Sequence, residues 1–100
     1  MAREVKLMVN NQVIQLDKFV EGFVYHTSRG MLASLEGTGD IQTAEIFMDG
    51  ESIRVAVNNN EIPVNVFVTK ILRSTITGMV SPLKGVSEIG KLHLIFKNNP

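Results

Sequence analysis

The chain has 100 residues, and its ten basic and ten acidic side chains cancel, which disfavours nucleic acids and anionic membranes as partners. Cysteine is absent, which excludes disulfides, thiolate metal sites and a cysteine nucleophile. This length predicts a single domain over residues 1–100, and because neither a signal peptide nor a membrane-spanning apolar run is visible, we expect a cytoplasmic protein.

Two strands are predicted at the start of the chain. In "EVKLMV", Val5, Leu7 and Val9 alternate with polar or flexible residues, and this period of two is typical of a strand with one buried side. Asn10 and Asn11 follow, and asparagine tolerates the positive φ angles that tight hairpin turns require. The segment "QVIQL" then returns as a second strand.

A helix is predicted from Lys18 to Leu35. Asp17 is a favourable N-cap, and the hydrophobic spacing changes after it from two to about 3.6 residues. At about 100° per residue one continuous arc forms, and we expect this arc to face the sheet. It contains Phe19, Val20, Phe23, Val24, Thr27, Gly30, Met31, Ser34 and Leu35. Gly37 is expected to close the helix, and a strand with Ala44, Ile46 and Met48 on its inner side follows.

The second half of the chain repeats the first at an offset of 48 positions. Residues 3–50 align with residues 51–98 without a gap, and similarity at one fixed period indicates a duplicated structural unit. Twelve of the aligned pairs are identical, and they lie between positions 9 and 41 of the first unit: Val9/Val57, Asn10/Asn58, Asn11/Asn59, Ile14/Ile62, Phe19/Phe67, Val20/Val68, Thr27/Thr75, Gly30/Gly78, Met31/Met79, Leu35/Leu83, Gly37/Gly85 and Ile41/Ile89.

The second unit is therefore expected to contain the same elements. Its helix, capped by Asn65, should turn toward the sheet an arc of Phe67, Val68, Ile71, Leu72, Thr75, Gly78, Met79, Pro82 and Leu83. Its second strand contains Pro63, which cannot donate to a ladder and is expected at a sheet edge. The predicted fold is α+β: a tandem ββαβ duplication forms one pseudo-twofold domain, with two helices on one face of a six-stranded, mostly antiparallel sheet.

Gly30 and Gly78 lie within the predicted apolar arcs. Because a glycine inside a helix costs about 1 kcal/mol relative to alanine, we expect a compensating close approach of the backbone to the other helix or to the sheet. The alternative is a slot for a small apolar ligand between the helices and the sheet.

Two surfaces are candidate interfaces. Met8, Phe47, Ala56 and Ile95 are predicted on the face of the sheet that the helices leave uncovered, where they could contact a protein partner or a second copy of the chain. Val66, Ile76 and Val80 make the second helix apolar beyond its inner arc. They are either buried more deeply within the chain or in contact with another subunit.

The sequence contains no catalytic constellation that we can identify. His26 is predicted at the rim of the first helix's arc and His93 on the outer side of the last strand, and neither is linked to a nucleophile. Cofactors, metal sites and catalytic residues are not expected, because the carboxylates are scattered and "EGTGD" follows a helix where a phosphate cradle would precede one.

The sequence favours a non-catalytic binding or assembly module, not an enzyme, that forms a homo-oligomer or binds a protein partner. A small apolar ligand binder is the first alternative. A nucleic-acid-binding protein that uses the open sheet face is the second, and zero net charge disfavours nucleic acid as a partner.

Overall fold

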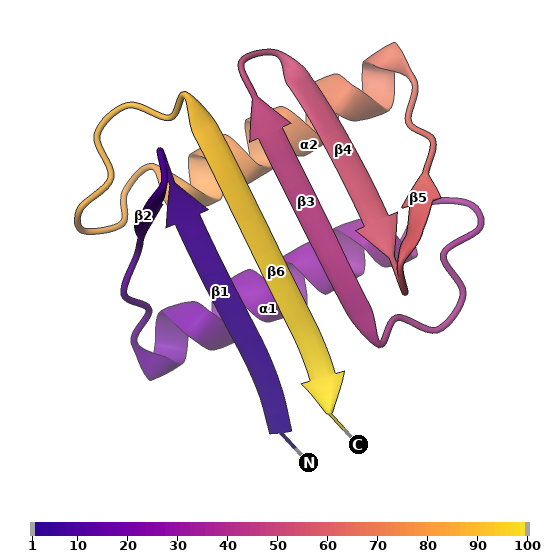
Figure 1. Ribbon diagram of the computed structural model, residues 1–100, viewed down its shortest axis with the longest axis horizontal. Coiled ribbons are helices and arrows are strands. Elements are labelled where there is room, and N and C mark those ends of the chain that lie inside the picture. Colours follow the sequence, from indigo (N-terminus) through magenta and orange to yellow (C-terminus); the bar gives the residue numbers. More distant parts are fainter. Residues whose placement is uncertain (1, 100) are drawn as a thin grey trace.

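The computed structural model describes residues 2–99, which form one antiparallel six-stranded sheet with two helices on one face (Figure 1). In chain order the elements are β1 Ala2–Val9, β2 Gln12–Val13, α1 Lys18–Ala33, β3 Thr43–Asp49, β4 Ser52–Val57, β5 Asn60–Ile62, α2 Val66–Val80 and β6 Lys91–Asn99. The predicted α+β class, the six strands and the two helices on one face are confirmed.

The strand order in the sheet is β2-β1-β6-β3-β4-β5. The first and last strands of the chain are paired along their length, so that Ala2 lies opposite Asn99. Strands β6 and β3 form the centre of the sheet, where Ile46 pairs with Leu94. The short strands β2 and β5 form the two edges, and Pro63 directly follows β5, at the edge where its missing N–H is tolerated.

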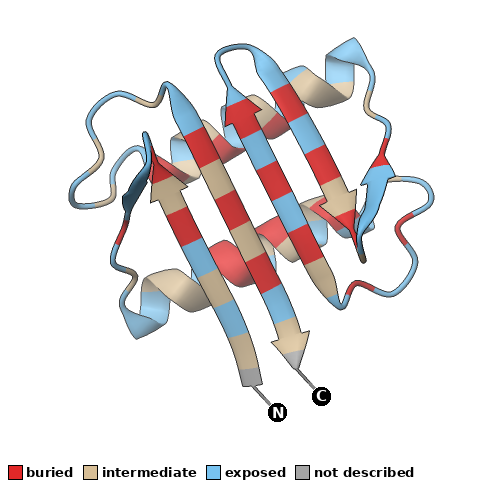
Figure 2. Cartoon of the chain, viewed as in Figure 1, coloured by how far each residue is buried: buried red, intermediate tan, exposed pale blue. Residues whose placement is uncertain are grey.

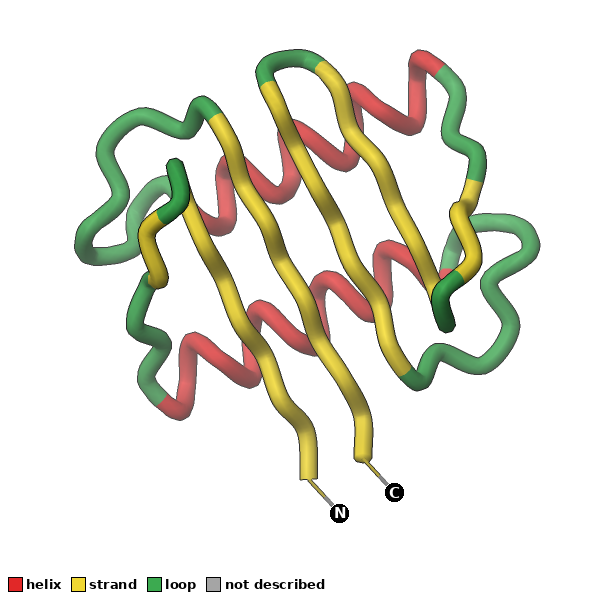
Figure 3. The backbone as a smooth tube through the Cα atoms, viewed as in Figure 1, coloured by secondary structure: helices red, strands yellow, loops and turns green. Residues whose placement is uncertain are grey.

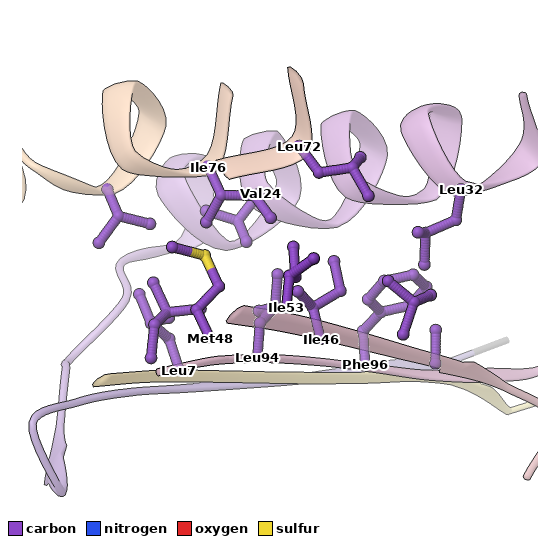
Figure 4. Close-up of a cluster of buried hydrophobic side chains, with 14 of the residues drawn as sticks. Leu7, Val24, Leu32, Ile46, Met48, Ile53, Leu72, Ile76, Leu94 and Phe96 are labelled. Carbon is purple, nitrogen blue, oxygen red and sulfur yellow. The ribbon is translucent and has the colours of Figure 1, made fainter. Parts of the chain in front are cut away.

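The core lies between the sheet and the two helices. Along β3 and β4 every second residue is buried, as Figure 2 shows. The buried side chains of the sheet drawn in Figure 4 point toward the helices. Ile46, Leu94 and Phe96 from the sheet meet Val24 and Ile76 from the helices (Figure 4). A fully buried side chain of this size contributes about 1.5–3 kcal/mol, so this single layer of contacts stabilises the fold.

Both helices begin where the sequence predicts. The side-chain oxygen of Asp17 accepts a hydrogen bond of 2.8 Å from the Val20 N–H, and that of Asn65 accepts one of the same length from the Val68 N–H. Each cap satisfies a backbone donor that has no partner within its helix. Helix α1 ends at Ala33, slightly before the predicted end at Leu35, and α2 ends at Val80.

The side chain of Asn10, in the β1–β2 turn, forms hydrogen bonds with the loop that precedes β6. Figure 3 shows this loop beside the turn. Asn10 has a φ of 52°, and its Oδ1 accepts hydrogen bonds of 2.9 Å from the N–H groups of both Gly90 and Lys91. Its Nδ2 donates to the carbonyl of Glu88 at 2.6 Å. One side chain therefore satisfies three backbone groups of a segment far along the chain.

Asn58 does the same in the β4–β5 turn for the loop in front of β3. It also has a φ of 52°, and its Oδ1 accepts from the N–H groups of Gln42 and Thr43 at 2.8 and 3.1 Å. Its Nδ2 donates to the Asp40 carbonyl at 2.6 Å. The two loops that lead into the central strands are thus held by equivalent contacts.

The predicted orientation of the helices about their own axes is wrong. The residues that face the sheet are centred on Ser28 in α1 and on Ile76 in α2, whereas Phe19 and Phe67, both expected to point inward, are 78% and 67% exposed. The apolar arc of each helix is wider than the strip that the sheet covers, and the side that stays exposed is the one that carries these aromatics.

Within residues 2–99, neither helix combines the length and the hydropathy that crossing a membrane would require.

Candidate functional site

The uncovered side of the sheet, here called the open sheet face, carries two cross-strand rows. The first row runs from Met8 through His93 and Phe47 to Arg54, each residue opposite the next on neighbouring strands. The second row runs from Ile95 through Glu45 and Ala56 to Glu61. Cross-strand neighbours on one face lie close enough for their side chains to touch.

The four residues predicted for this face are all found there. Met8, Ala56 and Ile95 are half-buried among their neighbours, and Phe47 is the most exposed of the four at 42%. The apolar area is small and is interrupted by charged side chains. The position of the four residues is therefore as predicted, and their role as an interface stays a prediction.

A histidine–carboxylate pair lies at the centre of the open sheet face. The Nε2 of His93 is 2.6 Å from Oε1 of Glu45, and the His93 and Phe47 rings make a T-shaped contact with 5.4 Å between ring centroids. The pair follows from the register, because Glu45 and His93 occupy diagonal positions on the paired strands β3 and β6. The sequence analysis did not identify this contact, since the adjacency of β3 and β6 was not predicted.

A shallow cavity of about 300 Å³ adjoins this pair. It is lined by Glu45, Phe47, Arg54, Val55, Ala56, Glu61 and His93. The pair could move a proton, but this lining holds no serine or threonine that such a base would activate. Across residues 2–99, no three acidic or histidine side chains lie close enough together to hold a metal ion.

The second surface is the outer side of the two helices, here called the outer helix surface. Its large apolar side chains are exposed by 48–79%, and they are Phe19 and Phe23 on α1 and Val66, Phe67 and Ile71 on α2. At about 100° per residue, Phe19, Phe23 and Gly30 lie on the side of α1 opposite Ser28, the centre of its buried side. An exposed apolar area of this kind is unusual for a surface that meets only water.

The aromatic half of α1 is held firmly against β1. The guanidinium of Arg3 donates a hydrogen bond of 2.7 Å from Nε to Oε1 of Glu21 and lies 5.3 Å from the centre of the Tyr25 ring. Gly22 leaves room for it, because a Cβ at that position would lie 2.9 Å from the guanidinium. The rings of Phe19 and Phe23 stack on each other with 6.2 Å between their centroids. These exposed rings therefore lie on the part of α1 that Arg3 links to β1.

Gly30 and Gly78 belong to the outer helix surface. Both are exposed, and a Cβ added to either would meet no other atom of the chain within 4 Å. The expectation that these glycines closely approach the other helix or the sheet is therefore wrong for the chain by itself. The helices are rotated about their axes relative to the prediction, and this rotation places both glycines on the outer side. For the same reason neither glycine borders a space between the helices and the sheet.

The three apolar residues singled out on the second helix separate into two groups. Ile76 and Val80 are fully buried in the core, so of the two alternatives burial within the chain is correct, and they cannot contact another subunit. Val66 is 79% exposed at the start of α2 and remains available. Leu32 of α1 is also completely buried.

Sequence reasoning missed the exposed aromatics, although one signal was present. Phe19/Phe67 and Gly30/Gly78 are identical between the two halves, and this identity was assigned to the core. In the structure these pairs lie outside the core, where packing within the chain does not require them.

The chain matches no protein-family model, and the comparisons with curated proteins and with solved structures find no match either.

Proposed function

We propose that this chain is a non-catalytic assembly module that self-associates through the outer helix surface. The observation that carries the proposal is the exposure of Phe19, Phe23, Val66, Phe67 and Ile71 on the two helices that share one face of the sheet. Burying such side chains against a partner is favourable by about 25 cal/mol per Å² of apolar surface. The open sheet face offers a smaller apolar area with charges of both signs.

The proposal includes an internal duplication with pseudo-twofold symmetry. The hydrogen bonds of Asn10 and Asn58 support it, since each donor or acceptor in the first set lies 48 positions from its counterpart in the second. The strand order supports it as well, because it reads the same from both edges when each strand is replaced by its equivalent in the other half. Each half then contributes one helix to the interface.

The two alternatives have weaker support. A ligand slot between the helices and the sheet is not favoured, because Gly30 and Gly78 face outward. Nucleic acid on the open sheet face is not favoured, because basic residues such as Arg54 are interspersed there with Glu45 and Glu61. Neither alternative gives a role to the exposed aromatics.

The proposal is tested by the native mass in solution, measured by light scattering across a concentration series up to several hundred micromolar. We expect the wild type to form a dimer and Phe67→Ser to be a monomer. Phe47→Ser is the matched control, because it removes an exposed phenylalanine from the open sheet face and should leave the dimer intact. A wild-type monomer at every concentration would refute self-association.

A further inference from the structure

The outer helix surface alternates between bulky and hollow regions along each helix. In α1 the aromatic pair Phe19 and Phe23 lies in the first half and Gly30 near the end, and in α2 Phe67 and Ile71 precede Gly78 in the same way. A Cβ at either glycine would meet nothing within 4 Å, so each helix presents a bulky end and a bare end to the outside.

The two helices run in opposite directions along the same face of the sheet (Figure 1). The bulky half of α1 therefore lies beside the bare half of α2, and the bulky half of α2 lies beside the bare half of α1. Seen from outside, bulky and hollow regions occupy alternate corners of the surface. A surface with this arrangement is complementary to itself when a second copy is turned over onto it.

Resting on the proposed function, we infer that the partner of this surface is a second copy of the chain, docked helix layer against helix layer. A twofold axis in the plane of the interface brings the bulky half of each helix onto a bare half in the second copy. Phe19 and Phe23 of one copy then cover the exposed backbone at a glycine of the other copy, and Phe67 and Ile71 do the same. The contacting helices are antiparallel, and each of Gly30 and Gly78 allows close approach across the interface.

The available area is sufficient for such a contact. With accessible areas of about 150–200 Å² for residues of this size, the exposed fractions of the five apolar residues amount to about 500–650 Å² per copy. Two copies would bury about 1,000–1,300 Å² of this surface, and the rest of the helix surface and the polar rim would add to it. Specific interfaces begin at about 1,000–1,200 Å² in total, so the surface meets this requirement at the lower end.

This arrangement also gives the helical glycines a function. Glycine lowers helix stability relative to other residues, and neither glycine is needed for packing within the chain because the space beside it is open. A second copy that seats an aromatic ring on the exposed backbone would occupy that space. A larger side chain at the glycine would fill the hollow and hold the two helix layers apart.

The test uses Gly30→Leu and Gly78→Leu in the full-length chain. Leucine is the better helix former and has room at both positions, so the thermal midpoint of the monomer should stay the same or rise. Dimerisation should nevertheless weaken, with a dissociation constant raised at least tenfold and a smaller increase for the alanine variants. Sedimentation equilibrium measures the association, and circular dichroism at low concentration measures the midpoint.

The matched control is Ala56→Leu, which adds the same side chain to the open sheet face and should leave association unchanged. The docking inference is overturned, while self-association stands, if the wild type and both glycine variants dimerise equally well but Ala56→Leu fails to dimerise. If the wild type is monomeric throughout, the proposed function fails and the docking inference fails with it.

Discussion

The two asparagines that hold the loops act through their side-chain hydrogen bonds as well as through their backbone conformation. Asn58 and its neighbour Asn59 both have positive φ, at 52° and 68°, but only Asn58 binds the loop before β3 with its side chain in the part of the chain that the structure describes. A comparison of Asn58 with Asn59 therefore separates the contribution of the side-chain hydrogen bonds from that of the backbone conformation.

We expect Asn59→Ala to cost about 1 kcal/mol, the strain of placing alanine in the left-handed region. Asn58→Ala should cost about 2.5–5.5 kcal/mol, because it also removes three hydrogen bonds worth about 0.5–1.5 kcal/mol each. Urea unfolding of the two variants measures the difference. Asn10→Ala and Asn11→Ala should behave as the same pair, and equal losses within a pair would show that the side-chain bonds contribute nothing.

Ser28 is the one polar side chain at the centre of the buried side of α1. It is completely buried, and among the described residues its Oγ has no hydrogen-bond partner. A buried hydroxyl without a partner costs about 1–3 kcal/mol, so Ser28 weakens the core at the centre of the buried side of α1, whereas α2 has the fully buried Ile76 at the centre of its buried side.

Ser28→Ala should therefore stabilise the protein. Ser74→Ala is the control, because Ser74 is exposed within α2 and reports only the higher helix propensity of alanine, about 0.5 kcal/mol. We expect the gain at Ser28 to exceed the gain at Ser74 by about 1 kcal/mol in chemical unfolding. A gain no larger than that at Ser74 would mean that the Ser28 hydroxyl is satisfied in solution.

At the scale of the elements, the rotation of α2 divides its apolar residues between core and surface. Ile76→Ala removes a fully buried side chain that packs into the core and should cost about 2–5 kcal/mol. Phe67→Ala removes a larger side chain that is 67% exposed, and should change stability by no more than about 0.5 kcal/mol when the protein is dilute enough to be monomeric. Unfolding at low concentration compares the two, and the reverse order would contradict the orientation of α2.

The strands and helix starts could be predicted because their signals are local. Alternation in "EVKLMV" and the caps Asp17 and Asn65 depend on neighbouring residues only. The orientation of the helices could not be predicted, because the apolar residues of each helix cover more of its circumference than the sheet does. Repeat identity then pointed to Phe19 and Phe67, which lie on the exposed side.

The strand order could not be predicted either, since it depends on pairing between distant segments. The β1–β6 pair joins the two ends of the chain, and the β3–β6 pair joins the last strands of its two halves. The contact between Glu45 and His93 is a consequence of the second pairing. That part of the open sheet face therefore appears only when the two halves are assembled.

The whole molecule is a thin slab of one sheet and one helix layer, 35 × 34 × 18 Å. In such a slab the core is covered on one side by helices whose outer sides meet solvent, and here those outer sides carry phenylalanine. Docking two helix layers would place four layers in sequence, with the aromatics in the middle. The open sheet faces would then remain on the outside of the dimer.

The adjacency of the chain ends gives a prediction for the molecule as a whole. Ala2 pairs with Asn99, and the β3–β4 turn pairs Asp49 with Ser52 around two residues, of which Gly50 has a φ of 61°. Glu4 pairs with Lys97 in the same sheet. At the offset of 48, Glu4 corresponds to Ser52 and Lys97 corresponds to Asp49, so this pair matches the pair that flanks the β3–β4 turn. If the halves are duplicates, the chain ends occupy the place of a second such turn.

A circular permutant should therefore fold, with two glycines linking Asn99 to Ala2 and new ends opened between Gly50 and Glu51. No strand pairing is lost, and closing a two-residue turn between paired ends has a low entropic cost. We expect cooperative thermal unfolding and the far-ultraviolet circular dichroism of the original chain. A permutant opened between His26 and Thr27 uses the same linker but interrupts α1, and should fail to unfold cooperatively. If the first permutant also failed, the β3–β4 turn would be essential to folding and the two halves could not exchange places in the chain.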